Sequence, residues 1–453
     1  MNFGDIKKVH FVGIGGIGMS GIAELLAEAG VSVSGCDLRP SSASELRRRR
    51  GISVSAGHDP AHLEGVDLVV VTAAVREGNR EIDAARERGI RVMRRSEMLG
   101  EIVNRKRAVG VAGTHGKTTT SSMIAVVLEE AGLDPTVLVG GIVRNLAANA
   151  KSGRGELLVV EADEYDRTFH HLHPEIAVVT NIEADHLEYF GSFEAIREAF
   201  RVFLQGVRPG GAVVACVDDP AVAELLPSVA GPRLIRYGLA PLPGLDFRAT
   251  NLRFDGGGSS FDVPGLGSFR LLVPGEHNVR NALAAIAVGR ELGIETSVIA
   301  RGLARFLGVD RRFQLLGEYA GAIIVDDYAH HPTEIRATLD AARRGYPGRR
   351  IVALFQPHLY SRTRDFAGDF AASLRVADVA LVAPIYAARE EPISGITARL
   401  IADASHDIEL IDASNEEIAA ELRRRLRPND VFITMGAGDV HEIGEALVAG
   451  GAA

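Results

Sequence analysis

Short apolar runs alternate with longer amphipathic stretches along almost the whole chain. Each run is short enough for a buried β-strand, and most end in glycine or a polar residue. Strands that are apolar on both sides and separated by helices form parallel sheets covered on both faces. The pattern therefore predicts an α/β fold. The runs that carry this prediction are VHFVG, DLVVVTAAV, AVGVAG, ELLVVEAD, AVVTNI, IIVDDY, IVALFQP and VFITMGAGD.

Three of these strands lead through a glycine- or histidine-bearing turn into a helix, which indicates three α/β domains in tandem. They begin at Val9, Ala108 and Ala322. Between about residues 239 and 275 the pattern changes to short, glycine-rich alternating pieces, which predict β-hairpins appended to the middle domain. The predicted domains are a Rossmann-like domain at residues 1–105, a central domain at 106–309 and a Rossmann-like C-terminal domain at 310–453.

Composition and charge narrow the functional class. The chain has 453 residues, a formal net charge of -9, 46% hydrophobic and 24% charged residues. A negative balance argues against a broad surface for nucleic acid or anionic membrane, and no apolar run reaches the length of a membrane span. Cys36 and Cys216 lie in valine-rich stretches, which suit reduced core thiols better than a disulfide or a metal site. We expect a cytoplasmic protein with no nucleic-acid or membrane partner.

The first motif is a glycine-rich turn after the first strand. Gly13, Gly15 and Gly18 form G-x-G-x-x-G, in which backbone N–H groups can approach a diphosphate at the start of a helix. Asp37, at the end of the next predicted strand, is placed to accept a hydrogen bond from a ribose hydroxyl. NAD is the usual inference, but the same geometry serves any nucleotide diphosphate, and tight strand–helix packing is the simpler alternative.

The second motif is more specific. AVGVAGTHGKTTTSSM reads as a strand, a glycine-rich turn and a helix, and is a shortened variant of the P-loop. Its amides would cradle phosphates, the Lys117 ammonium would neutralise the β- and γ-phosphates, and the Thr118 hydroxyl would reach Mg²⁺. The motif predicts that the central domain has a P-loop ATPase-type parallel sheet.

Polar residues at the ends of further strands are candidates for the same crevice. Glu161, Asp163 and Glu164 follow one buried-type strand, and Asp185 and His186 follow another. Strand ends of an open parallel sheet are where ligands bind. A magnesium site beside Thr118 is one interpretation, although histidine is an unusual ligand for Mg²⁺, and a plain surface turn is the other.

The C-terminal third adds histidines and arginines at strand ends. A lone histidine in such a turn is more often a cap than a catalyst, but here several occur beside arginines. They are His277, His330, His331, His358, Arg311, Arg312 and Arg362.

The chain resembles the Mur ligases in nine segments that follow in register and cover nearly its whole length. They are HFVGIGGIGMSGIAELL, AGTHGKTTT, EADEYD, VTNIEADH, PGEHNVRNALAA, GVDRRFQ, DDYAHHPTEIRATL, FQPHLYSRT and GAGD. The branch that it resembles adds L-alanine to UDP-N-acetylmuramic acid. The resemblance implies that the first domain holds the UDP-sugar, the second holds ATP and Mg²⁺ (or Mn²⁺), and the third closes over them with the amino acid.

The resemblance also implies roles for residues that match the family's motifs. The lactyl carboxylate would become an acyl phosphate that the alanine amine attacks. Catalytic roles fall to Lys117, Glu161, His186 and His358, and metal ligation to Thr118, Glu161 and His186. ATP contacts fall to Gly113, Thr114, His115, Gly116, Lys117, Thr118, Thr119, His277, Asn281, Arg311, Arg312, Asp327 and Tyr328. UDP-sugar contacts fall to Gly13, Gly15, Gly16, Ile17, Gly18, Asp37 and Thr72, and amino-acid contacts to His330, His358 and Arg362.

The chain departs from the family pattern at three positions near the expected substrate region. Leu359 stands where many relatives carry arginine, Tyr165 where serine is common, and Arg389 where glycine is frequent. These departures bear on amino-acid selectivity and not on the reaction class.

Three other hypotheses remain at this point. A sister ligase would join a tripeptide to the same sugar, although GIGGIGMSG resembles the alanine-adding branch. An NAD-dependent dehydrogenase would use the first glycine turn and Asp37, but would leave the second loop without a purpose. A P-loop switch would bind partners without forming an amide. Either a monomer or a homodimer is compatible with the sequence.

Overall fold

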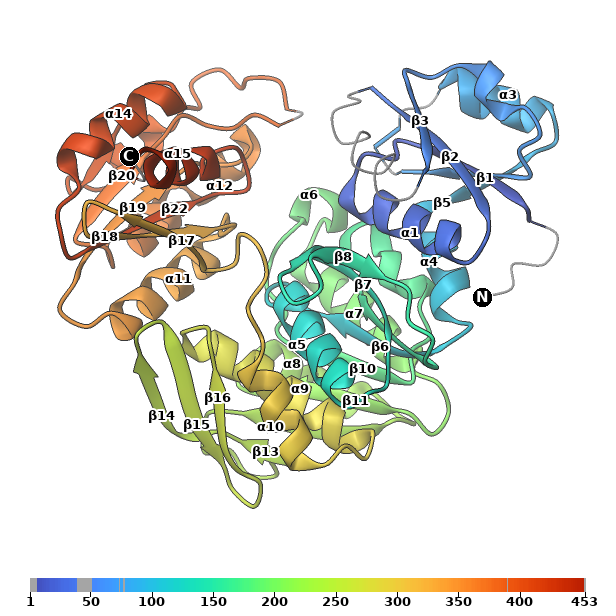
Figure 1. The fold of residues 1–453 in the computed structure, drawn as a ribbon, viewed down its shortest axis with the longest axis horizontal. Helices are drawn as coiled ribbons and strands as arrows, with labels where there is room; N and C mark the ends of the chain where they lie inside the picture. The colour runs from blue at the N-terminus through green and yellow to red at the C-terminus, as the bar shows by residue number, and fades with distance from the viewer. Residues whose placement is uncertain (1–5, 39–50, 73, 76–77, 389, 452–453) are drawn as a thin grey trace. The chain divides into compact units, whose positions relative to one another are not determined.

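The computed structural model describes residues 6–38, 51–72, 74–75, 78–388 and 390–451. The chain divides into two compact units (Figure 1). The first comprises Met1–Ala249 and Arg280–Leu303, and the second comprises Thr250–Val279 and Ala304–Ala453. Within the described ranges, no helix combines the length and the apolar character needed to cross a membrane. The predicted three-domain α/β fold is confirmed.

The N-terminal part of the first unit is a five-stranded parallel sheet in the order β3-β2-β1-β4-β5. Val9 and Phe11 of the first strand pack with the core under two helices, whereas His10 and Val12 face the opposite side, as the two-residue period of a strand requires. The strands are β1 (Lys8–Val12), β2 (Ser32–Asp37), β3 (Ser53–Ala56), β4 (Leu68–Val71) and β5 (Arg91–Arg94), and the helices are α1 (Ile17–Glu28), η2 (Pro60–Leu63), α3 (Arg80–Glu87) and α4 (Arg95–Val103).

The central part of the first unit is an eight-stranded sheet in the order β13-β12-β11-β10-β6-β9-β7-β8, parallel except for β8. β6 lies between β9 and β10. The strands that follow β6 are first added on the β9 side of it, and those that follow β9 are added on the β10 side. This change of direction creates the crevice where open α/β sheets bind ligands. Its strands are β6 (Arg107–Ala112), β7 (Thr136–Val143), β8 (Ala148–Lys151), β9 (Leu157–Glu161), β10 (Ile176–Val179), β11 (Ala212–Cys216), β12 (Arg233–Gly238) and β13 (Phe247–Arg248). Its helices are α5 (Lys117–Glu130), η3 (Tyr165–His171), α6 (Leu187–Phe190), α7 (Phe193–Gln205), α8 (Pro220–Leu225), η4 (Leu226–Ser228), α9 (Glu276–Glu291) and α10 (Thr296–Ala304).

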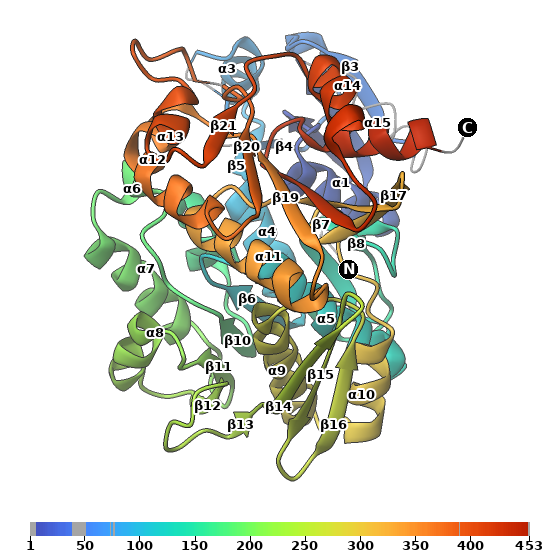
Figure 2. The same ribbon diagram turned by 90° about the vertical axis from the view of Figure 1, so that its left-hand side faces the viewer.

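The second unit begins with the predicted hairpin region. Three antiparallel strands lie side by side there (Figure 2). They pack on α11, where the Arg344 guanidinium lies 5.8 Å from the centre of the Phe254 ring. This region therefore belongs by its contacts to the C-terminal unit, although the sequence suggested an appendage of the middle domain. The strands are β14 (Thr250–Asp255), β15 (Gly258–Val263) and β16 (Gly267–Leu271).

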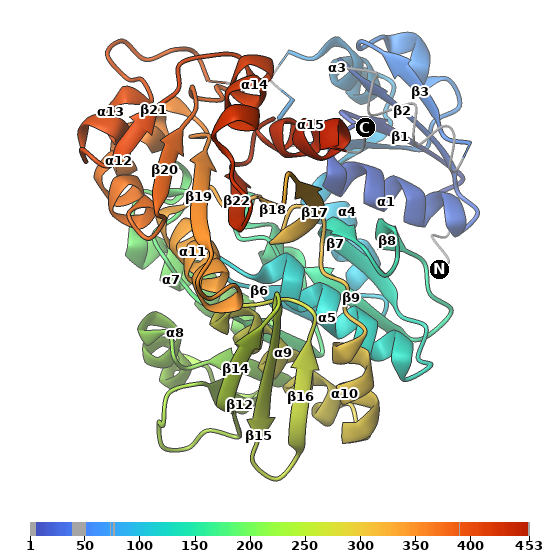
Figure 3. The same ribbon diagram turned by 60° about the vertical axis from the view of Figure 1, so that its left-hand side comes forward.

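The main sheet of the second unit has six strands in the order β17-β18-β22-β19-β20-β21, with only β17 antiparallel. Helices α11 and α12 cover one face and α14 and α15 the other (Figure 3). The strands are β17 (Gln314–Tyr319), β18 (Ala322–Asp327), β19 (Arg350–Phe355), β20 (Val379–Val382), β21 (Ile408–Leu410) and β22 (Asp430–Met435), and the helices are α11 (Pro332–Gly345), α12 (Tyr360–Leu374), α13 (Arg399–Asp403), α14 (Asn415–Arg425) and α15 (His441–Gly451).

Candidate functional site

The loop between β6 and α5 has a backbone path that only glycine follows without strain. Gly113 has φ 142° and Gly116 has φ 81°. A Cβ at Gly113 would lie 1.9 Å from Thr180 Oγ1, and one at Gly116 would lie 2.8 Å from Asn281 Oδ1. Side chains are thus excluded from both turns, so the backbone itself can approach a ligand at the start of α5.

Lys117, the first residue of α5, points back over this loop. Its Nζ donates to the Gly113 carbonyl at 2.6 Å and to both oxygens of Glu164 at 2.7 and 2.9 Å. Burial opposes the charged ammonium, but the carboxylates of Glu164, Asp163 and Glu161 outweigh it and raise the pKa of Lys117. The lysine is therefore a fixed positive charge at the mouth of the loop.

Thr118 and Glu161, two of the three predicted metal ligands, are brought together. The Thr118 hydroxyl donates to Glu161 Oε2 at 2.8 Å, and the same oxygen accepts from the Gly140 amide at 2.7 Å. A hydroxyl and a carboxylate offer the oxygen ligands that Mg²⁺ prefers. This part of the predicted site fits the ion.

His186, the third predicted ligand, lies against Tyr165. Their ring centres are 5.1 Å apart, and His186 adopts a left-handed conformation with φ 55° at the start of α6. Its Nε2 lies 3.8 Å from Asp185 Oδ2. Tyr165, which stands where serine is common in the family, therefore packs against the histidine expected to bind the metal.

Other predicted ATP residues surround the loop in the first unit. The Thr114 hydroxyl accepts from the Glu183 amide at 2.8 Å, and the His115 amide donates to Asn181 Oδ1 at 2.8 Å. Thr119 is half-buried on the first turn of α5. Asn281 stands beside Gly116 from α9. His277, at the start of the same helix, belongs to the second unit, where a Cβ at Gly275 would lie 2.6 Å from its ring.

Three residues that shape this loop have no role among the sequence predictions, although Glu164 is a candidate for the crevice. Glu164 is 3% exposed and holds Lys117, yet EADEYD gives no reason to rank it above its neighbours. Thr180 and Asn181 both donate to the His115 carbonyl, at 2.6 and 3.1 Å. Their signal in the sequence is the polar pair at the start of VTNIEADH, directly after the strand.

The first glycine turn has the expected close approach. Gly13 has φ 81°, and a Cβ there would lie 2.5 Å from Thr72 Cγ2. Asp37 Oδ2 accepts from the Gly15 amide at 2.9 Å. The predicted UDP-sugar residues Gly13, Gly15, Asp37 and Thr72 thus lie together, with Asp37 holding the glycine loop.

Gly16, Ile17 and Gly18 form the start of α1. Gly16 caps the helix without any side-chain hydrogen bond, and a Cβ there would meet no atom within 4 Å. A Cβ at Gly18 would lie 3.0 Å from the Arg95 guanidinium. The Ile17 side chain is exposed, and its carbonyl accepts from Asn149 Nδ2 at 3.0 Å.

In the second unit, the neighbouring arginines Arg311 and Arg312 have different surroundings. Arg311, with φ 61°, donates to Asp326 Oδ2 at 3.1 Å and to the Gly436 carbonyl at 2.7 Å. Arg312 Nη1 lies 3.5 Å from Glu334 Oε1. Both guanidinium groups lie over the Tyr328 ring, at 5.0 and 5.3 Å from its centre.

Asp327, at the end of β18, is engaged with the backbone. Its carboxylate accepts from the amides of Phe313 and Ala329, each at 2.7 Å. Burial raises the pKa of Asp327 to about 6, although the Arg312 charge acts in the opposite direction. The residue fixes the turn that carries Tyr328.

The predicted amino-acid residues gather after β18 and β19. The ring centres of His330 and His358 are 6.3 Å apart. Burial lowers the pKa of His330 to about 4, Glu334 opposes the shift, and the charge of Arg362 adds to it. All three predicted residues therefore belong to one neighbourhood.

The turn at His358 has an unusual backbone. Leu359 has φ 71°, its amide donates to the Tyr386 carbonyl at 3.0 Å, and the rings of His358 and Tyr386 stack with centres 5.9 Å apart. A leucine in the left-handed region is strained. Leu359, which stands where many relatives carry arginine, therefore has a strained backbone conformation. Arg389, which stands where glycine is frequent, lies outside the described residues.

Comparison with known families matches three successive parts of the chain. They are the Mur ligase family catalytic domain at residues 8–107, the Mur ligase middle domain at 111–289 and the Mur ligase glutamate ligase domain at 311–438.

Full-length relatives agree with these matches. The chain is 45% identical to a UDP-N-acetylmuramate–L-alanine ligase from Geobacter sp. (strain M21), covering 98% of each chain. It is 46% identical to one from Myxococcus xanthus, covering 97% of this chain and 94% of the relative. Among solved structures, a UDP-N-acetylmuramate–alanine ligase from Thermotoga maritima is 30% identical over 98% of both chains, with a TM-score of 0.82. A murein peptide ligase from Psychrobacter arcticus is 26% identical with a TM-score of 0.70. On these similarities, which confirm the predicted resemblance, the chain belongs to the Mur ligase family.

Proposed function

We propose that this ligase joins L-alanine to the lactyl carboxylate of UDP-N-acetylmuramic acid at the expense of ATP. The products would be UDP-N-acetylmuramoyl-L-alanine, ADP and phosphate, which makes the step part of peptidoglycan synthesis. The observation that carries the proposal is the 45% identity, over 98% of both chains, to a ligase named for these two substrates.

The reaction requires the carboxylate to be activated, because its oxide is a poor leaving group. Transfer of the γ-phosphoryl group of ATP gives an acyl phosphate, and the amine then attacks its carbonyl carbon and expels phosphate. Negative charge accumulates in both steps. The Lys117 ammonium, held over the loop of Gly113 and Gly116, supports this proposal because its raised pKa keeps it charged.

Thr118, Glu161 and His186 are the residues that we propose to hold Mg²⁺, or Mn²⁺. When bound, the ion would neutralise charge on the transferring phosphoryl group. The hydrogen bond between Thr118 and Glu161 supports the first two assignments. Tyr165 packs against His186, and so orients its ring.

We assign the amino acid to the neighbourhood of His330, His358 and Arg362. The Arg362 guanidinium offers a fork for the carboxylate of alanine. The amine must lose a proton to attack, and His358 is the proposed base. With a pKa of about 4, His330 is neutral at neutral pH, which avoids repulsion of an incoming ammonium group.

The remaining ligand contacts follow the same logic. The UDP diphosphate would lie at the start of α1 over Gly13, Gly15 and Gly18, and Asp37 would hold that loop through the Gly15 amide. For adenine, the contacts that we propose are His277, Asn281 and Tyr328, and they rest on the match of these residues to the family's motifs alone. We further propose a cytoplasmic location, consistent with two buried, unbridged cysteines. The proposed domain boundaries 1–105, 106–309 and 310–453 follow the order of the chain, and residues 250–279 of the central segment fall in the same compact unit as the C-terminal sheet.

The proposal is tested by phosphate release from ATP with UDP-N-acetylmuramic acid and a panel of acceptors. L-Alanine should support turnover far better than the tripeptide L-alanyl-γ-D-glutamyl-meso-diaminopimelate, and omission of either substrate should stop it. Lys117→Ala should lower kcat/KM by roughly 10²–10³-fold, by analogy with the loss of one oxyanion donor. Lys151→Ala is the matched control, because Lys151 pairs with Glu129 and Asp134 away from the loop. Equal ATP turnover without acceptor, or preference for the tripeptide, would overturn the proposal.

A further inference from the structure

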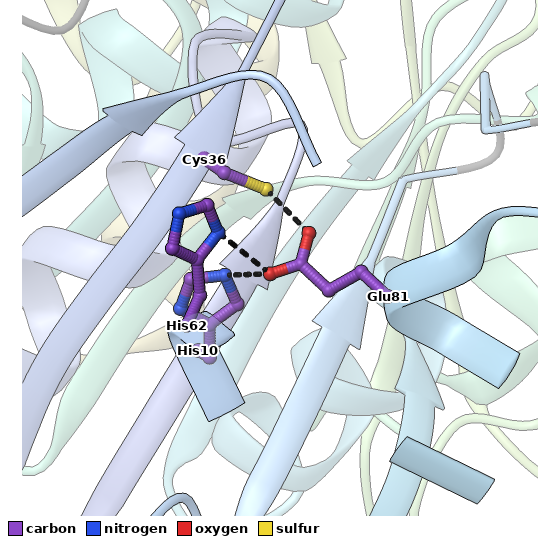
Figure 4. A group of neighbouring side chains, drawn as sticks. All are labelled: His10, Cys36, His62 and Glu81. Carbon is purple, nitrogen blue, oxygen red and sulfur yellow. Dashed lines mark hydrogen bonds and ion pairs between the residues drawn. The ribbon is translucent and has the colours of Figure 1, made fainter. Parts of the chain in front are cut away.

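Four side chains with metal-binding atoms converge in the N-terminal part of the first unit, on the sheet face opposite α1. They are His10 on β1, Cys36 on β2, His62 on η2 and Glu81 on α3 (Figure 4). One ligand atom from each lies within 4.8 Å of all the others. His10, Cys36 and Glu81 are at most 1% exposed. None of these residues has a place in the proposed ligase reaction.

The distances within this His10–Cys36–His62–Glu81 cluster are close to those between the ligands of one small ion. Glu81 Oε1 lies 2.9 Å from His10 Nε2 and 3.0 Å from His62 Nδ1, and Glu81 Oε2 lies 3.0 Å from Cys36 Sγ. Ligands at about 2.0–2.3 Å from a tetrahedral Zn²⁺ are separated by roughly 3.3–3.7 Å. Each of these three pairs would therefore move apart by only a few tenths of an ångström to about half an ångström on binding, and the remaining pairs already lie within 4.8 Å.

The two ring nitrogens of His10 are arranged as in a histidine that binds a metal ion. Its Nδ1 lies 2.9 Å from Ser34 Oγ, which orients the ring and directs Nε2 into the cluster. Its Nε2 is buried and lies 2.9 Å from Glu81 Oε1, and the described residues give it no other polar partner. A histidine whose second nitrogen is held by a neighbouring polar group is the usual arrangement at metal sites.

The charges and surroundings also fit a divalent ion. Val12, Leu63, Val66, Val69 and Ala85 pack around the cluster, so water is largely excluded. A thiolate and a carboxylate together carry two negative charges, which Zn²⁺ would neutralise, while both imidazoles stay neutral. Sulfur and nitrogen ligands exclude Mg²⁺ and favour Zn²⁺.

We propose that His10, Cys36, His62 and Glu81 form a structural Zn²⁺ site beneath the first glycine turn. On binding, the Cys36 thiol loses its proton to solvent and the S–Zn bond forms, with no change of oxidation state. Because the Cys36 carbonyl accepts from the amides of Gly13 and Ile14, at 2.9 and 3.1 Å, the ion fixes the strand end that supports this turn. His58, whose Nδ1 is 3.2 Å from Cys36 Sγ, orients the thiolate.

Two measurements on the full-length protein test this site. Protein purified from zinc-supplemented medium and desalted should contain about one zinc per chain by mass spectrometry of the metal. After chelation, Co²⁺ should give the visible bands of a tetrahedral ion and a thiolate-to-cobalt charge-transfer band in the near ultraviolet. The charge-transfer band requires a cysteine ligand, so adventitious surface binding does not produce it.

Variants locate the site. Cys36→Ser should abolish the charge-transfer band, and both it and His62→Gln should weaken zinc affinity by more than the roughly 10–100-fold typical of losing an outer partner. Cys216→Ser is the matched control, because Cys216 is the other buried cysteine and has no part in the cluster. The inference is overturned if wild-type protein gives no charge-transfer band, or if the Cys36→Ser protein keeps it. The wild-type spectrum decides even if a variant fails to fold.

Discussion

The pair of Lys117 and Glu164 supports a prediction that separates stability from catalysis. Their side chains are 13% and 4% exposed and lie 2.7 Å apart. Removing one partner of such a buried pair leaves an uncompensated charge, whereas replacing both by neutral groups does not. Lys117→Met should therefore be destabilising, and Lys117→Met combined with Glu164→Gln should recover most of the loss.

The expected magnitude follows from the burial of Glu164. Lys117→Met should cost about 3–5 kcal/mol, which lowers Tm by roughly 6–20 °C in a domain of this size. Burial already raises the pKa of Glu164, and loss of the ammonium raises it further. A raised carboxyl pKa means that the folded state binds the proton more tightly than the unfolded state does. The loss of stability caused by Lys117→Met should therefore shrink as the pH falls through that pKa.

Thermal unfolding followed by circular dichroism at several pH values measures these effects, and phosphate release measures activity. The double variant should approach wild-type stability while remaining inactive, because no ammonium is left over the loop. If Lys117→Met unfolds at the wild-type temperature, or the double variant is no more stable than the single one, the ion pair does not have the role assigned to it.

Three further predictions concern the loop and the second unit. Gly113→Ala should cost more than about 2 kcal/mol and abolish turnover, because its Cβ would lie 1.9 Å from a side-chain oxygen. Gly132→Ala, also at a positive φ (72°) but in open space, should keep its activity, and denaturation and phosphate release check both variants. The pKa of His330 is about 4 in the folded protein and near 6.5 when unfolded, so the neutral histidine favours the folded state. Its contribution to the free energy of unfolding is complete above about pH 6.5 and falls by up to about 3 kcal/mol toward pH 4. Urea titrations of the His330→Gln variant should lack this part of the pH dependence. Arg311→Met should mainly lower Tm, because Arg311 is hydrogen-bonded to Asp326 and to the Gly436 carbonyl. Arg312→Met should mainly raise the KM for ATP, because the ion pair described for Arg312, with Glu334, is longer. The reverse pattern would mean that the two arginines have exchanged roles.

Sequence patterns predicted the elements and the turns because these depend on local properties. The P-loop variant identified Lys117 and Thr118, and the polar strand end after β9 identified Glu161, which the structure places against Thr118. Glycine spacing likewise located the turn at Gly13 and Gly15. Such features need only a strand, a turn and a helix in succession.

Other features depend on contacts between distant segments and could not be read from the chain. Of the neighbouring carboxylates Asp163 and Glu164, only the fold shows that Glu164 is the one buried against Lys117. Arg311 and Arg312 are adjacent in sequence, and only the fold shows which one Asp326 holds. Cys36 was expected to be a plain core thiol, but the topology brings it next to His10, His62 and Glu81 from three other elements.

The central claim is that ATP activates the lactyl carboxylate as an acyl phosphate. UDP-N-acetylmuramic acid labelled with ¹⁸O in that carboxylate tests it most directly. After reaction with ATP and L-alanine, mass spectrometry should find one ¹⁸O atom in each released phosphate, because the carboxylate oxygen leaves with the phosphoryl group. Unlabelled phosphate released in step with amide formation would contradict the account.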